Sequence, residues 1–344
     1  MKFAACISRS QTPRCGFRPQ LETLEDRTAP ALFATGADAG VPPRIKVFES
    51  NGVLRFNFLA FSSSFQGGVR VAVGDVSGDA TDDIIAAGGP GMRPRVRLFS
   101  GVDRTVITTF FPYGKAFRGG VYVAVGNFDA DATLEIVTGT GAGRAPLVRV
   151  WDVTGETVSP ITGSLHSFAP FGSGMSGGVT VAAGNIDGAD LDEVIVAVAD
   201  NGPPRVRAFR TDLSLAADFL AFGSAFRGGL FVAAGDLRGT AAEEILIGSG
   251  SGRASEVRIF TIGAGSPGPA TRIDNRFPYG SGYQGGVRVG IIDYNSDGQF
   301  DVIAAPGRGR SPLVLVLNGA NWVQLDAVVA YNGGQRGAFV GGSS

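Results

Sequence analysis

The sequence has little of the residue types that most catalytic and metal centres use. Its 344 residues include a single histidine and two cysteines. Catalytic triads, histidine-ligated zinc sites and most proton-shuttling sites need at least one histidine. The one present, His166, has no cysteine or carboxylate motif beside it, so we expect an ordinary surface residue on a strand. These shortages lead us to expect that the chain is not an enzyme.

Long hydrophobic runs and an excess of either charge are also missing. No apolar run reaches about 18 residues, so the sequence predicts no membrane span. Thirty basic residues against 31 acidic ones give a net charge of -1, which provides no general attraction to nucleic acid. Hydrophobic residues still make up 44% of the chain, too many for a disordered protein. We expect a folded monomer with no nucleic-acid partner.

Glycine, in contrast, is abundant, with 53 residues that fall in a repeat. A Gly-Gly pair followed by alternating apolar residues recurs at intervals of 51 to 58 residues, and an aromatic turn such as Phe110 to Tyr113 recurs with the same period. The pairs begin at Gly67, Gly119, Gly177, Gly228 and Gly285, with a weaker copy at Arg336-Gly337. Repeats of this length are typical of solenoids and propellers.

Each repeat unit has the pattern of four short strands. In the unit after Gly67, the apolar periodicity predicts strands at 69–73, 84–87, 95–99 and 105–111, separated by glycine-rich and polar turns. No amphipathic helical pattern occurs anywhere in the sequence. Four short strands in about 50 residues, repeated along the chain, predict an all-β protein with the β-propeller fold.

The repeat is offset from the ends of the chain. Residues 31–62 resemble the last three strands of a unit, and residues 337–344 resemble the missing first strand. We therefore predict that the N- and C-terminal strands share one blade and close a ring of six four-stranded blades over residues 31–344. Closure would remove the open sheet edges that invite aggregation. A truncated or open array, with six or seven blades, is the alternative.

The turn after the first strand of each unit carries oxygen side chains at the spacing of a calcium loop. In the turn 293–301, acidic or amide side chains occupy positions 1, 3, 5 and 9, with glycine at position 6 and a backbone carbonyl available at position 7. Crowded carboxylates repel one another unless a cation is present. The candidate Ca²⁺ ligands are Asp293, Asn295, Asp297, Gln299 and Asp301 in this turn; Asp75, Ser77, Asp79 and Asp83 in the first full unit; and Asn127, Asp129, Asp131 and Glu135 in the second. An uncharged Asx-type turn is the alternative.

Two further turns keep less of this pattern. The turn 185–193 has Ala189 at position 5, which removes one ligand. In the turn 236–244, Arg238 stands at position 3, where its charge can neutralise the acids, so we expect no metal there. An EF-hand is excluded for the turn 293–301 because position 12 is Ala304 rather than glutamate.

The unit resembles the FG-GAP, or VCBS, repeat of integrin α-subunit propellers and of many secreted bacterial proteins. The similarity covers about residues 31–344 and is carried by the aromatic residue before Gly-Gly, the Gly-Asp-rich turn and a Gly-x-Gly-x-x-Pro segment such as 89–94 or 141–146. The aromatic residues are Phe65, Phe117, Phe226 and Tyr283. The resemblance implies calcium in the turns and adhesion to, or recognition of, an unknown protein or glycan ligand. Integrin propellers have seven blades, so no partner surface can be carried over. A propeller lectin for acidic or neutral glycans, or a propeller polysaccharide lyase or hydrolase, is the alternative.

Residues 1–30 differ in character from the repeats. They do not form an ordinary secretory signal, but the segment 18–27 resembles the Leu-Glu-x-Leu-Glu-Asp-Arg leader that precedes repeat domains in secreted bacterial proteins. We therefore expect an extracellular or cell-surface location. Both cysteines, Cys6 and Cys15, lie in this leader, so the propeller is expected to contain no disulfide.

Arginines recur on the predicted third strands, and aromatic turns recur between units. Pairs such as Arg95 and Arg97, or Arg205 and Arg207, lie on one face of their strand. We expect them to form ion pairs between blades or to pack on aromatic rings, and a ring of cations for acidic glycans is the alternative. We likewise expect the aromatic turns to be buried between blades rather than to bind sugars.

Overall fold

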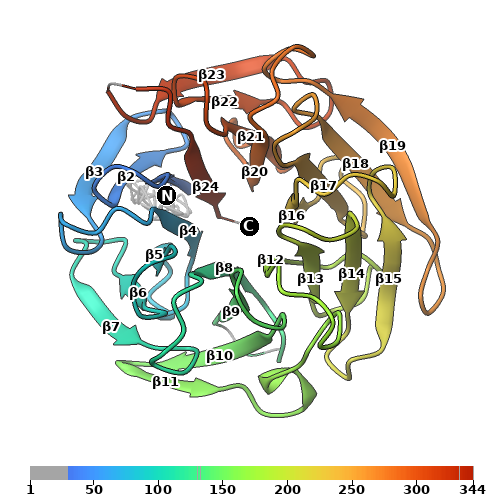
Figure 1. Cartoon of the computed structure of the whole chain (residues 1–344), viewed down its shortest axis with the longest axis horizontal. Helices are drawn as coiled ribbons and strands as arrows, with labels where there is room; N and C mark the ends of the chain where they lie inside the picture. Colours follow the sequence, from blue (N-terminus) through green and yellow to red (C-terminus); the bar gives the residue numbers. More distant parts are fainter. Residues whose placement is uncertain (1–29, 130, 132, 333, 344) are drawn as a thin grey trace, which may run out of the picture.

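The computed structural model describes residues 30–129, 131, 133–332 and 334–343. Twenty-four strands form six four-stranded antiparallel sheets that stand as blades around a central axis (Figure 1). The chain is therefore a six-bladed β-propeller, as the repeat predicts. The expected leader, with Cys6 and Cys15, falls almost wholly outside the described residues. Across the described ranges, no helix is long and apolar enough to span a membrane.

The blades are numbered in chain order, each from its innermost strand outward. Blade 1 contains β24 (Ala338–Gly342), β1 (Leu32–Ala37), β2 (Arg44–Glu49) and β3 (Leu54–Leu59), and blade 2 contains β4 (Val69–Gly74), β5 (Asp83–Gly88), β6 (Val96–Phe99) and β7 (Val106–Phe110). Blade 3 contains β8 (Val121–Gly126), β9 (Glu135–Thr140), β10 (Val148–Thr154) and β11 (Thr157–Pro160), and blade 4 contains β12 (Val179–Gly184), β13 (Glu193–Val198), β14 (Arg205–Phe209) and β15 (Leu215–Leu220). Blade 5 contains β16 (Leu230–Gly235), β17 (Glu244–Ser249), β18 (Val257–Ile262) and β19 (Ala270–Arg276), and blade 6 contains β20 (Val287–Ile292), β21 (Asp301–Pro306), β22 (Leu313–Leu317) and β23 (Gln324–Val329).

Blade 1 closes the ring, with strands from both ends of the sequence. The innermost strand β24 pairs with β1 in antiparallel register, from Phe33 opposite Gly342 to Ala37 opposite Ala338. On its other side the same strand packs against β4 and β20, the innermost strands of the two neighbouring blades. The predicted closure by N- and C-terminal strands is confirmed, and the open array is excluded.

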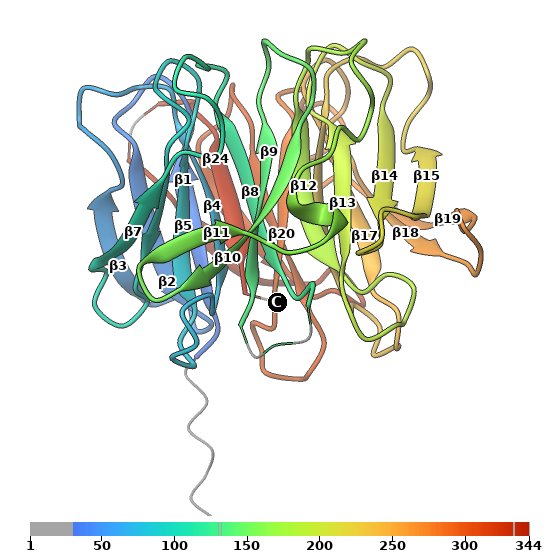
Figure 2. The same ribbon diagram turned by 90° about the horizontal axis from the view of Figure 1, so that it is seen from below.

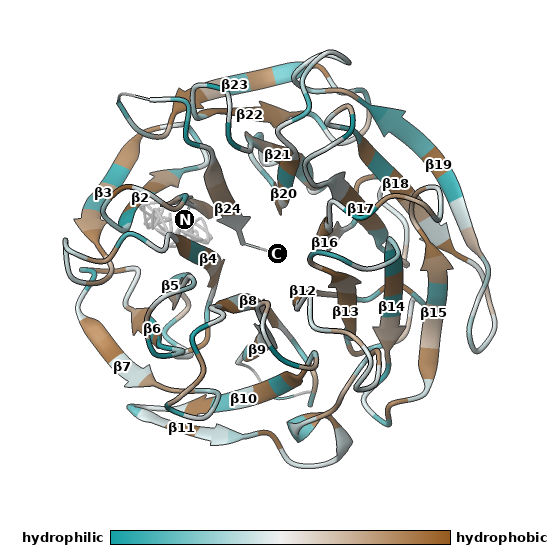
Figure 3. Ribbon diagram, viewed as in Figure 1, coloured by the Kyte–Doolittle hydropathy of each residue, from teal (hydrophilic) through white to brown (hydrophobic). Residues whose placement is uncertain are grey.

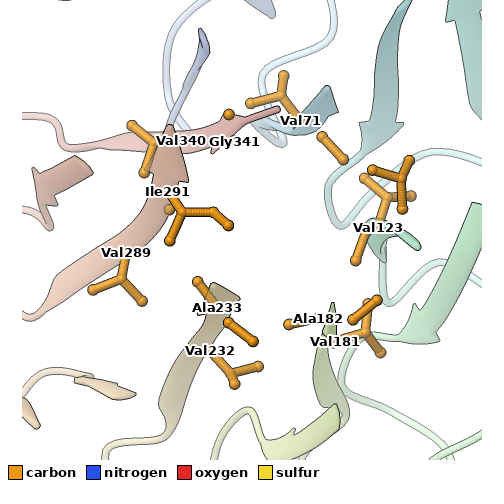
Figure 4. A pocket seen from close by; sticks show the side chains of 17 residues that line it. Val71, Val123, Val181, Ala182, Val232, Ala233, Val289, Ile291, Val340 and Gly341 are labelled. Atoms are coloured by element: carbon orange, nitrogen blue, oxygen red, sulfur yellow. The ribbon is translucent and has the colours of Figure 1, made fainter. Parts of the chain in front are cut away.

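The hydrophobic core lies between neighbouring blades. Inner strands such as β13 are mostly hydrophobic and wholly buried, whereas the outermost strand β19 is mostly hydrophilic and partly exposed (Figure 3). Around the axis, small and branched apolar side chains such as Val71, Val123 and Ala182 line a narrow cavity of about 80 Å³ (Figure 4). The centre of the ring is therefore a packed apolar channel and not a wide pore.

Arginines of the third strands connect adjacent blades. In blades 2 to 5 the guanidinium donates from Nη1 to a carbonyl oxygen of the preceding blade at 2.7–2.8 Å. The pairs are Arg97 with Ala60, Arg149 with Pro112, Arg207 with Pro170 and Arg258 with Ala221. The same guanidinium groups lie near aromatic rings, as expected. Their ion pairs, with Asp218 and Glu256, form within a blade, so the expectation of ion pairs between blades was wrong for these residues.

Backbone hydrogen bonds make a second set of connections, at the glycine-rich turn between the second and third strands. One amide in each of these turns donates to the carbonyl of the residue before the Gly-Gly position in the next blade, at 2.7–3.1 Å. The six donors are Gly40, Gly91, Gly143, Asn201, Gly252 and Gly309. All six have positive φ, which favours glycine and, next to it, asparagine. The recurring glycine of this turn is therefore explained by the contact between blades.

The structure also places the aromatic turns and His166. The aromatic turns pack between blades as expected: Phe61 and Tyr113 are both buried, and each meets the aromatic residue before Gly-Gly edge to face. His166 is exposed, but it lies in a 3₁₀ turn (Ser164–His166), so its expected place on a strand was wrong. The fourth strand of that blade ends at Pro160, before this turn.

Candidate metal centre

The acidic turns lie together on one face of the propeller. Each connects the innermost strand of a blade to the second strand, so all five project from the same end of the ring, the lower face in Figure 2. We call this end the acidic-turn face, formed by residues 75–83, 127–135, 185–193, 236–244 and 293–301. The Gly-Gly pairs precede the innermost strands and therefore lie at the opposite end, called here the Gly-Gly face.

The turn 127–135 brings three carboxylates together. Asp129, Asp131 and Glu135 each offer an oxygen within 4.8 Å of the others. Glu135 is buried at the start of β9, where its Oε2 accepts the backbone N–H of Phe128 at 2.7 Å, while the two aspartates are exposed. Within the described residues this is the one acidic group with such geometry. The structure thus assembles the three carboxylates that the sequence predicts for this turn.

The electrostatics of this group favour a bound cation. Burial, and to a smaller extent the charges of Asp129 and Asp131, raise the pKa of Glu135 to about 8. Its three oxygen donors suit a hard cation such as Ca²⁺, which prefers several carboxylate and carbonyl oxygens. The fourth predicted ligand, Asn127, donates its backbone N–H to Asp192 Oδ2 of the next blade at 2.8 Å. The residues of this turn therefore fit a calcium ion.

In the turn 293–301 the carboxylates are directed towards backbone amides. Asp293 accepts the N–H groups of Asp297 and Gly298, each at 3.1 Å. Asp301 accepts the N–H of Tyr294 at 3.1 Å, and the Asn295 side chain donates to Asp297 Oδ2 at 2.8 Å. Gln299 donates its backbone N–H to Asp297 Oδ1 at 2.9 Å. The turn with the most complete sequence pattern is thus closed by its own hydrogen bonds.

In the turn 75–83 the carboxylates likewise accept hydrogen bonds from backbone amides of their own turn. Asp75 accepts the N–H groups of Gly78 and Ala80 at 2.7 and 2.8 Å. Asp79 accepts the N–H of Thr81 at 2.9 Å, and the buried Asp83 accepts that of Ser77 at 3.0 Å. Burial raises the pKa of Asp83 to about 6. The predicted ligands of this turn lie in one loop, but their carboxylate oxygens accept hydrogen bonds from backbone N–H groups of the same turn.

An arginine approaches the acids in each of the two remaining turns. Arg210 contacts Asp187 at 2.7 Å, between Nε and Oδ2. Arg238 lies 3.9 Å from Glu244, between Nε and Oε1, in the arrangement that the sequence predicts. Arg210 could not be recognised as part of a turn from the sequence, because it follows the third strand of its blade. A guanidinium supplies in these two turns the positive charge that a cation would supply in 127–135.

The sequence pattern missed the acidic residues at position 8 of these turns. Asp82, Asp192 and Glu243 are largely buried against the preceding blade, and burial raises the pKa of Glu243 to about 7. The backbone N–H at position 8 also donates to the carbonyl at position 1 of the preceding turn, as from Glu243 to Asn185 at 2.9 Å. The visible signal was the doubled acid, Asp-Asp, Asp-Glu or Glu-Glu, before the second strand. The turns therefore form a connected series rather than separate loops.

Comparisons with known proteins show similarity in fold. No family model and no curated protein matches the chain. Among solved structures, the rhamnogalacturonan lyase YesW aligns at 14% identity and TM-score 0.41, over 87% of this chain and 64% of that one. The exotype rhamnogalacturonan lyase YesX aligns at 14% and 0.39, over 83% and 65%, and U3-55K aligns at 13% and 0.46, over 90% and 76%. The chain thus spans less than two thirds of the length of either lyase, and it is similar to all three in fold alone.

Proposed function

We propose that this chain is a non-enzymatic propeller that binds Ca²⁺ at the turn 127–135 and acts as an exported module for adhesion or recognition. The observation that carries the calcium assignment is the group of Asp129, Asp131 and Glu135 oxygens within 4.8 Å of one another. The repeat resemblance supports export and recognition of a protein or glycan ligand. The position of the turn, between β8 and β9, supports a structural role for the cation.

The expected energetics are modest. Calcium sites of extracellular modules have dissociation constants of about 10⁻⁴–10⁻³ M. At millimolar calcium, one such site stabilises the fold by on the order of 1 kcal/mol. Because the fold already closes through β24 and the contacts between blades, the cation would stabilise the acidic-turn face without being required for folding.

Calorimetric titration of the full chain with CaCl₂ tests this assignment. We expect one site in the wild type and its loss in Asp131→Ala. The matched control is Thr240→Ala, which changes the same position of the turn that contains Arg238. Calcium binding that persists in Asp131→Ala would contradict the assignment. Binding in the wild type that Thr240→Ala removes equally would place the cation elsewhere.

The lectin alternative depends on exposed aromatic rings. The aromatic turns are poor candidates because Phe61 and Phe222 are each 4% exposed and pack between blades. A glycan array probed with the full chain in calcium separates the two proposals. Saturable glycan binding would favour a lectin, whereas no glycan binding, together with binding to immobilised proteins in a parallel assay, would favour recognition of a protein ligand.

A further inference from the structure

Two arginines occupy the same position in different blades, at the Gly-Gly end of the channel. Arg70 is the second residue of β4, and Arg288 is the second residue of β20. The two residues are 8% and 9% exposed, respectively. Each guanidinium lies between two aromatic rings: Arg70 is 4.6 Å from the centroid of Tyr122 and 5.1 Å from that of Phe339. The two sites therefore offer an internal comparison.

Arg288 has protein partners at both terminal nitrogens, although its Nε, like that of Arg70, is buried without one. Its Nη1 donates to the carbonyl of Pro306 at 2.9 Å, and its Nη2 donates to Asp38 Oδ2 at 2.7 Å. Asp38 belongs to the turn after β1, so the ion pair crosses from blade 6 to blade 1. The charge of Arg288 is thus neutralised by the next blade around the ring.

Arg70 has no such partner among the described residues. Its Nε and Nη1 are buried and donate to no acceptor among the described residues. The equivalent of Asp38 in the blade after Arg70 is Gly141, since Asp38 and Gly141 each stand two residues before the glycine that binds the next blade. Two aromatic faces attract this cation, but they satisfy none of its N–H groups. A buried charge without a counter-charge is costly, which points to a ligand.

A cavity of about 460 Å³ opens over these side chains on the Gly-Gly face. Arg70 and Arg288 line it with the rings of Tyr122, Phe231 and Phe339. The repeated glycines, such as Gly67 and Gly119, form its rim and keep it free of other side chains. The cavity is large enough for a monosaccharide-sized molecule, and its floor is the unpaired guanidinium.

We propose that Arg70 anchors a small organic monocarboxylate in this cavity. A guanidinium donates well to carboxylate oxygens, and the aromatic rings provide apolar walls for the rest of the ligand. Asp38, Asp200 and Arg308 also line the cavity, so its three arginines exceed its aspartates by one positive charge. A ligand with one negative charge is therefore favoured over a doubly charged phosphate or sulfate. This site lies on the face opposite the calcium turn, so it is independent of the function proposed above.

The test is an NMR titration of the full chain with galacturonate or acetate at constant ionic strength, in which the chemical shifts of the protein are measured. Galacturonate methyl ester is the matched control, because it has the same size without the charge. We expect shifts with both acids and none with the ester. Absence of shifts with the acids, or equal binding of the ester, would overturn the proposal.

Two variants place the binding at Arg70. Arg70→Met keeps an aliphatic stem between the rings and removes the charge, so galacturonate should bind at least about tenfold more weakly. Its melting temperature should not fall, which separates a ligand anchor from a structural contact. Asp38→Asn frees Arg288 and should strengthen binding or add a second site. Unchanged binding in Arg70→Met, or weaker binding in Asp38→Asn, would contradict the assignment.

Discussion

Arg97 donates from Nη1 to the carbonyl oxygen of Ala60 at 2.8 Å, across the boundary between blades 1 and 2. The same bond, between residues 37 positions apart, recurs at three further blade boundaries. Blade 6 has Leu315 at the equivalent strand position, and at that boundary Arg310, from the turn before the strand, donates from Nη1 to the Tyr279 carbonyl at 3.0 Å. Each unit thus contributes a polar bond to its predecessor as well as apolar packing.

Replacing this arginine should weaken the boundary between blades. We expect Arg97→Met to lower the free energy of unfolding by about 1–2 kcal/mol, because a hydrogen bond from a charged donor is lost while most of the side-chain packing remains. Urea denaturation measures the change. Arg95→Met is the matched control, since Arg95 lies on the same face of the strand region and makes no such bond. Equal losses in the two variants would show that the bond contributes nothing of its own.

Removal of the closing strand should be far more damaging. Deletion of residues 336–344 takes away β24, exposes the edge of β1 and opens the apolar channel, so the melting temperature should fall sharply. A synthetic peptide with the sequence of these residues, added in trans, should restore part of the loss. A deletion variant that melts like the intact chain would contradict a structural role for the closure.

Calcium removal should have a small and local effect. A chelator should lower the melting temperature of the wild type by a few degrees, in keeping with about 1 kcal/mol for one weak site. Differential scanning calorimetry with and without calcium measures this shift. With or without calcium, Asp131→Ala should melt near the temperature of the chelator-treated wild type. The melting temperature of Thr240→Ala should still rise when calcium is added. A chelator effect that survives in Asp131→Ala would count against the site.

Glu243 should make stability depend on pH. Burial, and next the charge of Asp192, raises its pKa from 4.5 to about 7 in the folded state. Between these values the folded chain binds more protons than the unfolded chain, so this residue makes stability fall as the pH rises. Glu243→Gln should match the wild type below about pH 4.5 and exceed it above about pH 7, by on the order of 3 kcal/mol. Urea midpoints measured across that range, in chelator, should diverge; parallel curves would contradict the prediction.

The preference for glycine at the positive-φ position between the second and third strands can be tested at Gly91, where an added side chain has room. No atom lies within 4 Å of a Cβ added to Gly91, so a substitution there meets only backbone strain, at φ 102°. Gly91→Val should lower the free energy of unfolding by about 1–2 kcal/mol, and Gly91→Asn by less. The reverse change, Asn201→Gly, should be nearly neutral. Equal effects of valine and asparagine at position 91 would mean that φ does not determine the choice of residue.

The fold could be predicted from the sequence because each unit repeats its local signals. The spacing of the Gly-Gly pairs indicated the number of blades, and the offset of residues 31–62 indicated how the ring closes. His166 was misplaced because an added turn interrupts the outer strand of its blade, and the unit pattern contains no sign of it.

The candidate sites were harder to predict, because they depend on which residues meet across a turn or a boundary. Turns 127–135 and 293–301 share a spacing of oxygen side chains, and the aspartates of both accept backbone N–H groups. Among the described residues, the turn 127–135 alone also brings three carboxylates within 4.8 Å of one another. The contrast between Arg70 and Arg288 is set by Gly141 and Asp38, which lie in the following blades. A pattern read within one unit does not contain that relationship.

The pairing of β24 with β1 joins positions about 300 residues apart. Until that pairing forms, blade 1 is a three-stranded sheet with an open inner edge, and blades 2 and 6 each face this incomplete neighbour. Folding therefore cannot finish during synthesis of the earlier repeats, and such distant pairing is slow to form. A nascent chain that ends before β24 would keep the inner edge of β1 unpaired. A closed ring therefore forms only in chains whose translation has included β24.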